Sequence, residues 1–144
     1  MRIFVDANIP MYAAGAAHPL KACSLQVLEA AARGRFVAVS NVEVLQEIMH
    51  RYASLGSREK GAEVAELFMH VLQDVLPVTR EDMVQALTLY RQYPQAQARD
   101  TVHAAVMRNS GVTIIVTADR HFDQFAGLQR VDPLDFERFL KEKG

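Results

Sequence analysis

The chain has 144 residues, half of them hydrophobic, and a formal net charge of −1. A chain of this length can bury roughly two thirds of its unfolded surface, so we expect a single domain over residues 1–144. The near-balanced charge is typical of globular proteins and does not by itself indicate nucleic-acid binding. Twelve of the 16 basic residues are arginine, which suits phosphate contacts, although a coding bias explains the excess equally well.

The single cysteine and the apolar runs bear on the compartment. Cys23 excludes an internal disulfide, and we expect it to be buried in an Ala- and Leu-rich helix, compatible with a reducing compartment. No apolar run approaches the roughly 20 residues that span a bilayer. Asp6 also lies where a signal peptide would be apolar. We therefore expect a cytoplasmic protein without a membrane partner.

The chain begins with a predicted buried strand. Residues 3–5 form an unbroken apolar run, which is the pattern of a strand buried on both faces of a parallel sheet. The run stops at Asp6, Asn8 follows, and Pro10 closes the segment. A carboxylate at the carboxyl end of such a strand lies where open α/β sheets bind their ligands.

The next segment is predicted to be helical. A helix begins at residues 11–17 and breaks at residues 18–19, His-Pro, because proline cannot occupy a helix interior. Residues 20–33 form a second helix, which ends at Gly34.

The second predicted strand spans residues 35–40 and leads into a long helix. Ser40 is the expected N-cap, with Glu43 completing an S-x-x-E capping box, and the helix runs to about Ser54. Another helix follows over residues 58–74.

The remaining elements repeat this alternation of strands and helices. In order, we predict a short strand at 75–78, a helix at 81–93 capped by Thr79 and Asp82, a helix at 98–109, a strand at 113–117, a helical turn at 121–125, an edge strand at 128–131 and a helix at 133–141. Strands separated by helices favour a parallel sheet that is covered on both faces.

Acidic side chains fall at positions that one edge of this sheet could gather. Asp6 and Asp119 each follow a buried strand, and neighbouring parallel strands would bring them together. Glu47 lies about two turns into the helix after the second strand, and Asp100 begins the helix before the strand that leads to Asp119. Asp123, four residues beyond Asp119, would share its face on a helical turn.

Carboxylates that converge in this way repel one another, and a divalent cation removes the repulsion. Hard oxygen ligands favour Mg²⁺ or Mn²⁺ over zinc, and such a site can activate water against a phosphodiester. Each acid alone also has a plain structural interpretation. Asp6 or Asp119 could be a turn residue, Glu47 a solvated helix residue, and Asp100 a favourable acid in a first helical turn.

The order of these motifs resembles the PIN domain family and, within it, the VapC-type toxin ribonucleases. The resemblance rests on VDAN, SNVEVLQEI, RDTVHAAVMRNSG, TIIVTADRHFDQF and a later VDP, and it covers essentially the whole chain. It implies a three-layer α/β/α fold whose central, mainly parallel sheet has four or five strands. It also implies a Mg²⁺- or Mn²⁺-dependent endoribonuclease that acts as the toxin of a type II toxin–antitoxin pair.

The resemblance further implies roles for individual residues. The catalytic acidic quartet would consist of Asp6, Glu47, Asp100 and Asp119. The metal would be held by Asp6, Asp100 and Asp119, with Asp123 as an accessory ligand. The acids would be oriented by Asn8 and Thr117. Glu43 stays open as the alternative to Glu47. Arg99 and Arg120, each next to an expected ligand, are the candidates for RNA phosphate contacts.

Other residues have structural and functional interpretations side by side. His103, one turn from Asp100, could contact RNA or act as a base, but an inward, hydrogen-bonded histidine is the favoured interpretation. The apolar faces around Leu67 and Leu87 exceed what a small sheet obviously needs. A homodimer surface, an antitoxin groove or core packing would each use them.

Two other function classes stay open. A phosphoaspartate protein also places an Asp at a strand end, but it needs a nearby lysine, and none of the four lysines follows a suitable strand. A phosphatase of that class also expects an acid where Asn8 stands. The second class is a PIN-like module that binds RNA or a partner without cutting RNA.

Overall fold

Five strands form one sheet in the order β3-β2-β1-β4-β5, and every neighbouring pair is parallel. The structure is a computed structural model that describes residues 1–143. The strands are β1 (Arg2–Val5), β2 (Val37–Asn41), β3 (Asp74–Leu76), β4 (Ile114–Val116) and β5 (Gln129–Val131).

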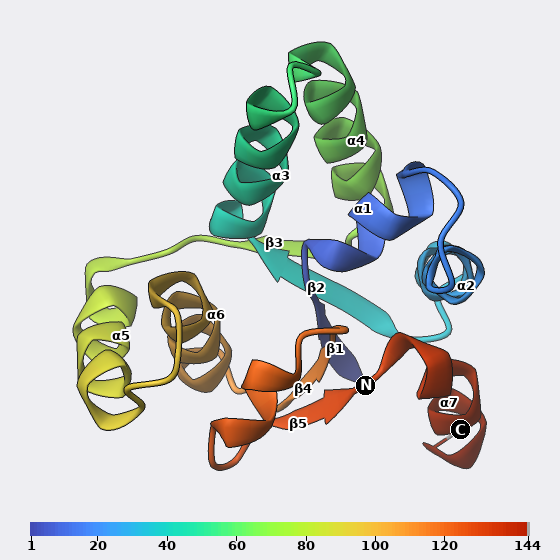
Figure 1. Ribbon diagram of the computed structural model, residues 1–144. Coiled ribbons are helices and arrows are strands. Elements are labelled where there is room, and N and C mark those ends of the chain that lie inside the picture. Colours follow the sequence, from blue (N-terminus) through green and yellow to red (C-terminus); the bar gives the residue numbers. More distant parts are fainter. Residues whose placement is uncertain (144) are drawn as a thin grey trace.

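Helices cover both faces of the sheet and confirm the expected three-layer α/β/α architecture (Figure 1). They are α1 (Asn8–Ala14), α2 (Lys21–Ala32), α3 (Val42–Ser54), α4 (Arg58–Val71), α5 (Arg80–Gln92), α6 (Ala98–Asn109) and α7 (Phe136–Lys143), with 3-10 helices η1 (Arg120–Gln124) and η2 (Pro133–Asp135). In Figure 1, α3 and α4 form a hairpin on one side of the sheet, and α5 and α6 lie side by side on the other.

The central strand β1 explains the unbroken apolar run at the start of the chain. Ile3, Phe4 and Val5 are fully buried because β1 pairs with β2 on one side and β4 on the other, and helices cover both faces. Burying each such side chain stabilises the fold by about 1.5–3 kcal/mol. From β1 the chain continues to β2 on one side, whereas β4 joins on the other. The carboxyl ends of β1 and β4 therefore form the switch point at which open α/β sheets bind ligands.

Helix α1 begins earlier than predicted. It starts at Asn8 and ends at Ala14, whereas the sequence suggested a start near Met11 because Pro10 was interpreted as closing the strand segment. Pro10 is instead the third residue of the helix, where a backbone N–H has no partner within the helix and is not missed.

The capping box predicted at Ser40 and Glu43 is wrong by one residue. Strand β2 continues through Asn41, whose side-chain Oδ1 accepts the Val44 N–H at 2.9 Å and caps α3. The Ser40 hydroxyl is buried and donates to the Val5 carbonyl at 3.0 Å, which ties β2 to β1.

Other predicted boundaries agree within a few residues. The Thr79 and Asp82 capping box is confirmed, with hydrogen bonds of 2.9 and 3.1 Å. Helix α4 stops at Val71, before the predicted end, because Asp74 already begins β3. Cys23 is partly exposed, contrary to expectation. In residues 1–143 we find no helix with the length and apolar character needed to cross a bilayer.

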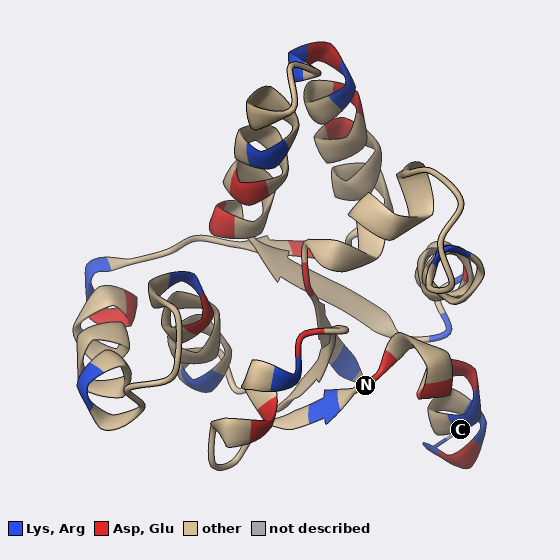
Figure 2. Ribbon diagram, in the orientation of Figure 1, with Lys and Arg blue, Asp and Glu red and all other residues tan. Residues whose placement is uncertain are grey.

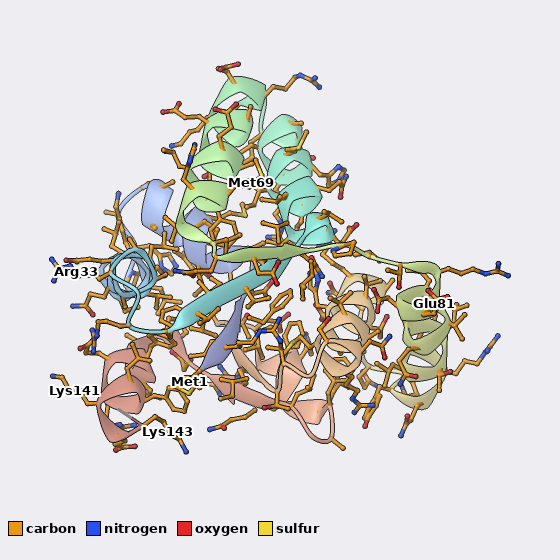
Figure 3. The ribbon with its side chains drawn as sticks, turned by 180° about the vertical axis from the view of Figure 1, so that it is seen from behind. Met1, Arg33, Met69, Glu81, Lys141 and Lys143 are labelled. Carbon is orange, nitrogen blue, oxygen red and sulfur yellow. The ribbon has the colours of Figure 1, made fainter. Side chains whose placement is uncertain are left out.

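The side chains divide between a packed interior and a charged periphery (Figure 3). Figure 3 shows Arg33, Glu81 and Lys141 at the outside of the molecule. Met69 of α4 is also exposed, and so is Leu67, which the sequence placed on the apolar face of that helix. Helix α4 packs against α3, α1 and α2, and its buried residues are instead Gly61, Val64, Ala65 and Phe68.

Candidate active site

Asp6 is held firmly at the carboxyl end of β1. Its backbone N–H donates to the Val116 carbonyl at 3.2 Å and so extends the pairing with β4. One side-chain oxygen accepts the Ala7 N–H at 2.8 Å, and the other accepts the Thr117 hydroxyl at 2.7 Å. The buried carboxylate is therefore fixed in one orientation.

Thr117 and Asn8 join the two loops that follow β1 and β4. The Asn8 amide donates to Thr117 Oγ1 at 2.8 Å, and its carbonyl oxygen accepts the Ala118 N–H at 3.3 Å. Thr117 Oγ1 also accepts the Asp119 N–H at 3.0 Å. The Thr117 hydroxyl thus donates to Asp6 while accepting two other bonds, so it ties the loop carrying Asp6 to the loop carrying Asp119.

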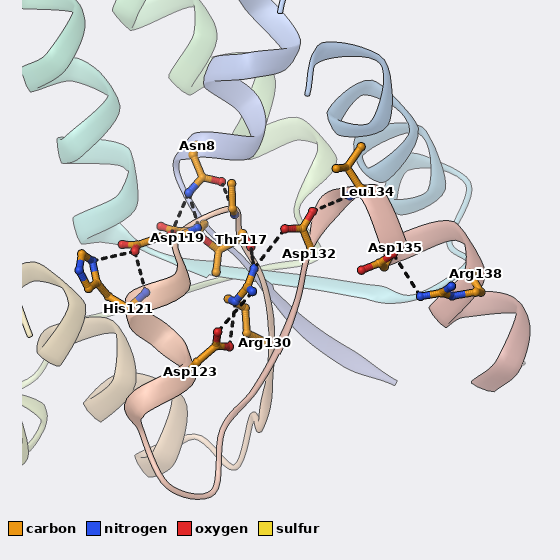
Figure 4. Close-up of polar contacts among 12 residues, drawn as sticks. Asn8, Thr117, Asp119, His121, Asp123, Arg130, Asp132, Leu134, Asp135 and Arg138 are labelled. Carbon is orange, nitrogen blue, oxygen red and sulfur yellow. Dashed lines mark hydrogen bonds and ion pairs between the residues drawn. The ribbon is translucent and has the colours of Figure 1, made fainter. Parts of the chain in front are cut away.

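Asp119 caps η1 and contacts a histidine that sequence reasoning did not select. Its Oδ1 accepts the His121 N–H at 2.9 Å and lies 3.0 Å from His121 Nδ1. Figure 4 shows the imidazole ring turned back onto the carboxylate. A contact over two residues depends on the backbone turn, so no spacing rule for a regular helix would have indicated it.

Two helices bring the other acids to the same place. Glu47 projects from the second turn of α3 and Asp100 from the first turn of α6, and both side chains are buried. Figure 2 shows acidic segments of α3, α6 and the loops after β1 and β4 around one central region. The four acids line a pocket of about 220 Å³, whose remaining wall residues are Asn8, Tyr12, Arg51, Gln97, Arg99 and Ala118.

The acids of the pocket belong to two groups of candidate metal ligands, and each group includes a histidine. Ligand atoms of Asp6, Glu47 and His103 lie within 4.8 Å of one another, and so do those of Asp100, Asp119 and His121. Among the described residues, neither Asp100 Oδ2 nor Glu47 Oε1 has a hydrogen-bond partner, although both are buried. Leaving a buried charged oxygen without a partner is costly, so the pocket is built for a group that supplies one.

The pKa values of Asp100 and Asp6 also indicate that the pocket favours a bound cation. Burial raises the pKa of Asp100 to about 6, and the neighbouring Asp119 and Asp6 carboxylates add to the increase. Burial also raises the pKa of Asp6, against the lowering effects of His103 and the Thr117 hydrogen bond. A cation among these oxygens would offset both effects, and an all-oxygen donor set fits Mg²⁺ or Mn²⁺.

Glu47 has different surroundings. Burial alone would raise its pKa, but His103, Arg99 and Arg51 together hold the pKa of Glu47 below its usual value. The carboxylate lies 3.5 Å from Arg99 Nε and 3.4 Å from Arg51 Nε. Glu47 is therefore ionised and already has two arginine neighbours, whereas no arginine or lysine pairs with Asp100 among the described residues. Glu43, the alternative to Glu47, does not line the pocket.

Three of the predicted site residues do not line the pocket: Thr117, which is buried, Asp123 and Arg120. The Asp123 side chain is 57% exposed, and its two oxygens accept hydrogen bonds from Arg130 at 2.9 and 3.3 Å (Figure 4). Asp123 is thus drawn toward β5 and away from the acids, so the structure does not support its assignment as an accessory ligand. Arg120 is exposed at the start of η1 and is not a wall residue, whereas Arg99 is.

Sequence reasoning missed Arg51 and Tyr12. Arg51 is four residues after Glu47 on α3, a spacing that places both on one helix face and that could have identified it. Tyr12 gave no such signal; it follows Asn8 by one turn of α1. The favoured interpretation of His103 is confirmed, because it is buried and lies 3.0 Å from the Asn41 amide.

Comparisons with known proteins agree with this geometry. The family model described as PIN domain matches residues 3–128. Ribonuclease VapC13 of Mycobacterium tuberculosis is 40% identical over 129 residues, which cover 90% of this chain and 98% of that protein. The crystal structure of VapBC2 from Rickettsia felis, bound to a DNA fragment from their promoter, has a TM-score of 0.73 at 18% identity and covers 92% of this chain and 98% of its own.

A second solved structure also shares this fold. Mycobacterium tuberculosis VapC20, a Sarcin-Ricin loop cleaving toxin, has a TM-score of 0.70 at 17% identity, covering 88% of this chain and 98% of that chain. The match of the family model includes Asp6 and Asp119, which follow β1 and β4, and the helices α3 and α6 that carry Glu47 and Asp100. This chain belongs to the PIN domain family.

Proposed function

We propose that this chain is an endoribonuclease that uses Mg²⁺ or Mn²⁺ to hydrolyse RNA phosphodiester bonds. The observation that carries the proposal is the meeting of Asp6, Glu47, Asp100 and Asp119 in one open pocket, although they are separated by more than a hundred residues. The relatives named ribonuclease, among them VapC13, support the same activity.

Three of the acids would hold the ion. Asp6, Asp100 and Asp119 are the candidates, because two of them have a raised pKa and Asp100 also has an oxygen without a partner. When bound, such an ion neutralises the carboxylates and supplies Lewis-acid activation of water and of a phosphate oxygen. Asp123 is left out of this set because Arg130 occupies both of its oxygens.

Glu47 would have a separate role as the base. Its lowered pKa keeps it ionised at neutral pH, and Glu47 lines the pocket, while its buried Oε1 has no hydrogen-bond partner among the described residues. The carboxylate can accept a proton from the attacking water and hold the water in line with the phosphorus. Arg51 and Arg99, which flank the same carboxylate, would pair with RNA phosphates near the scissile bond.

The activity is tested with a mixed single-stranded RNA substrate. We expect the wild-type chain to cut RNA with Mg²⁺ or Mn²⁺ but not with EDTA, and Asp6→Asn to abolish cutting while keeping the fold. Asp135→Asn is the matched control, since Asp135 is exposed and its side chain pairs only with Arg138 among the described residues. Full activity in Asp6→Asn would contradict the site. Binding of RNA without metal-dependent products would favour a binding module instead.

We also propose that the chain is the toxin of a type II toxin–antitoxin pair. VapBC2 of Rickettsia felis and a toxin-antitoxin complex from Klebsiella pneumoniae share the fold, with TM-scores of 0.73 and 0.64. An apolar groove of about 240 Å³ between α1, α2 and α4 would take an antitoxin segment; Leu67 and Leu25 on its walls are 60% and 48% exposed. Leu67→Glu should abolish capture by any small DNA-binding protein that an adjacent gene encodes, and unchanged capture would contradict this groove.

The exposed apolar face of α5 supports a proposed homodimer. Met83, Leu87 and Tyr90 of α5 are all exposed, which is unfavourable in a monomer. Light scattering should give twice the chain mass for the wild type and the monomer mass for Leu87→Glu. A wild-type monomer at micromolar concentration would contradict the homodimer.

A further inference from the structure

A chain of buried polar groups runs beneath Glu47. Asn41, at the end of β2, lies with its amide nitrogen 3.0 Å from His103 Nδ1, and His103 Nε2 lies 3.7 Å from Glu47 Oε1. All three side chains are buried. Polar groups in such a place cost stability unless they are paired, so their arrangement calls for an explanation.

The orientation of the Asn41 amide follows from the cap of α3. Its Oδ1 accepts the Val44 N–H at 2.9 Å, and an oxygen is needed there because a backbone N–H can only donate. The NH₂ group must then be the half that faces His103 Nδ1. Since NH₂ is a donor, Nδ1 is an acceptor and carries no proton.

The rest of the His103 environment leaves one place for the ring proton. The ring packs against Phe4 at 5.5 Å and lies parallel to Phe122 within 20°, at 6.5 Å between centroids. Apolar rings therefore cover its faces, and only its two nitrogens meet polar groups. In the neutral ring the proton is on Nε2, which faces Glu47 Oε1.

We infer that Asn41 and His103 act as positioning residues, which orient the Glu47 carboxylate by presenting a fixed Nε2–H to its Oε1. The role assigned to Glu47 rests on the proposed nuclease function, but the tautomer of His103 does not. At 3.7 Å the contact is longer than a hydrogen bond, and neither atom has a hydrogen-bond partner among the described residues, although Arg99 Nε lies 3.5 Å from the same Oε1. Contacts of this kind often shorten when substrate binds. Asn41, which caps α3, thus also orients Glu47, the proposed base on the same helix.

The tautomer can be measured without any activity. In a protein labelled with ¹⁵N-histidine, we expect the signals of the neutral His103 ring to show a protonated Nε2 and a bare Nδ1. The spectrum of His103→Gln assigns them by their absence among the five histidines. A His103 ring protonated on Nδ1 would overturn the inference, whether or not the chain cuts RNA.

The effect on catalysis is tested with matched variants. His103→Gln keeps an acceptor for Asn41 and a donor for Glu47, whereas His103→Leu has a similar volume and neither group. We expect His103→Leu to lower kcat by about 10- to 100-fold with KM unchanged, which is the usual effect of losing a group that orients a site residue. His103→Gln should keep most of the wild-type kcat. Equal kcat in folded His103→Leu and wild type would overturn the inference.

A double variant tests whether Asn41 acts through His103. Asn41→Ser keeps a good N-cap for α3 but removes the amide donor. If Asn41 acts through His103, the double variant Asn41→Ser with His103→Leu should have the same kcat as His103→Leu alone. If the kcat losses of the two single variants multiply in the double variant, Asn41 does not act through His103. Helical content and thermal midpoint, measured in parallel, distinguish the loss of the α3 cap from the loss of the hydrogen bond to His103.

Discussion

Replacing Asp100 by asparagine should stabilise the metal-free protein at neutral pH. The folded-state pKa of Asp100 is about 6, against an ordinary value of 3.8. Because the pKa is raised, the contribution of the protonated acid to stability is fully present below about pH 3.8 and is lost as the pH rises through about 6. A difference of about two pH units corresponds to about 3 kcal/mol, with burial and the nearby Asp119 and Asp6 as its causes.

Asparagine resembles the neutral acid at every pH, so Asp100→Asn escapes this loss. In EDTA at neutral pH we expect the variant to have a free energy of unfolding up to about 3 kcal/mol above that of the wild type, or roughly 10 °C in midpoint for a chain of this size. At about pH 4 the two should converge, since the wild-type carboxyl is then protonated.

Urea unfolding between acidic and neutral pH measures the effect, with the exposed Asp135→Asn as the control that leaves the pH profile unchanged. Added Mg²⁺ should stabilise the wild type more than Asp100→Asn, because an ion that binds only the folded state shifts the equilibrium by mass action. A metal-free Asp100→Asn protein that is less stable than the wild type at neutral pH would refute the assignment of repelling carboxylates.

Three further results are expected. Tyr12 lines the pocket, and its ring stacks on that of His18 with 4.5 Å between the centroids. Tyr12→Leu should raise KM for RNA about tenfold because base stacking is lost, while Tyr12→Phe should keep a KM near that of the wild type. Equal KM values in the Leu and Phe variants would exclude stacking. Arg99→Ala should weaken RNA binding and flatten its salt dependence, as measured by fluorescence anisotropy, and an unchanged slope would remove Arg99 from the phosphate contacts. Gly61→Ala should lower the free energy of unfolding by about 1–3 kcal/mol in urea titrations, because the added Cβ would lie 2.7 Å from Tyr52 Cβ. Replacing glycine by alanine within a helix usually raises that free energy by about 1 kcal/mol, and such a rise here would contradict the close packing.

Much of the fold could be predicted because local signals agreed with the tertiary structure. Helix α6 spans Ala98–Asn109, as the sequence indicated, and Gly111 beyond it takes the positive φ of 72° that ends such a helix. The parallel sheet followed from buried runs alternating with helices. The errors arose where two residues compete for one role. Ser40 and Asn41 are both good N-caps, and only the pairing of β2 decides that Asn41 caps α3.

The candidate site was predictable where the backbone decides it. Asp6 and Asp119 follow adjacent parallel strands, so the topology alone brings them together. The partners of each acid depend instead on side-chain directions that spacing does not encode. Asp123 is paired with Arg130 across the turn into β5, and His103 reaches Glu47 from a different helix. For this reason the order of the acids was visible in the sequence, whereas the proposed division between base and ion ligands was not.

The most direct test of the account is the position of a bound cation. Crystals grown with Mn²⁺ should show an anomalous peak within coordination distance of Asp6, Asp100 and Asp119, and the peak should be absent in crystals of Asp6→Asn. A protein that cuts RNA while Mn²⁺ binds elsewhere, or not at all, would contradict the central claim that these acids gather around one ion.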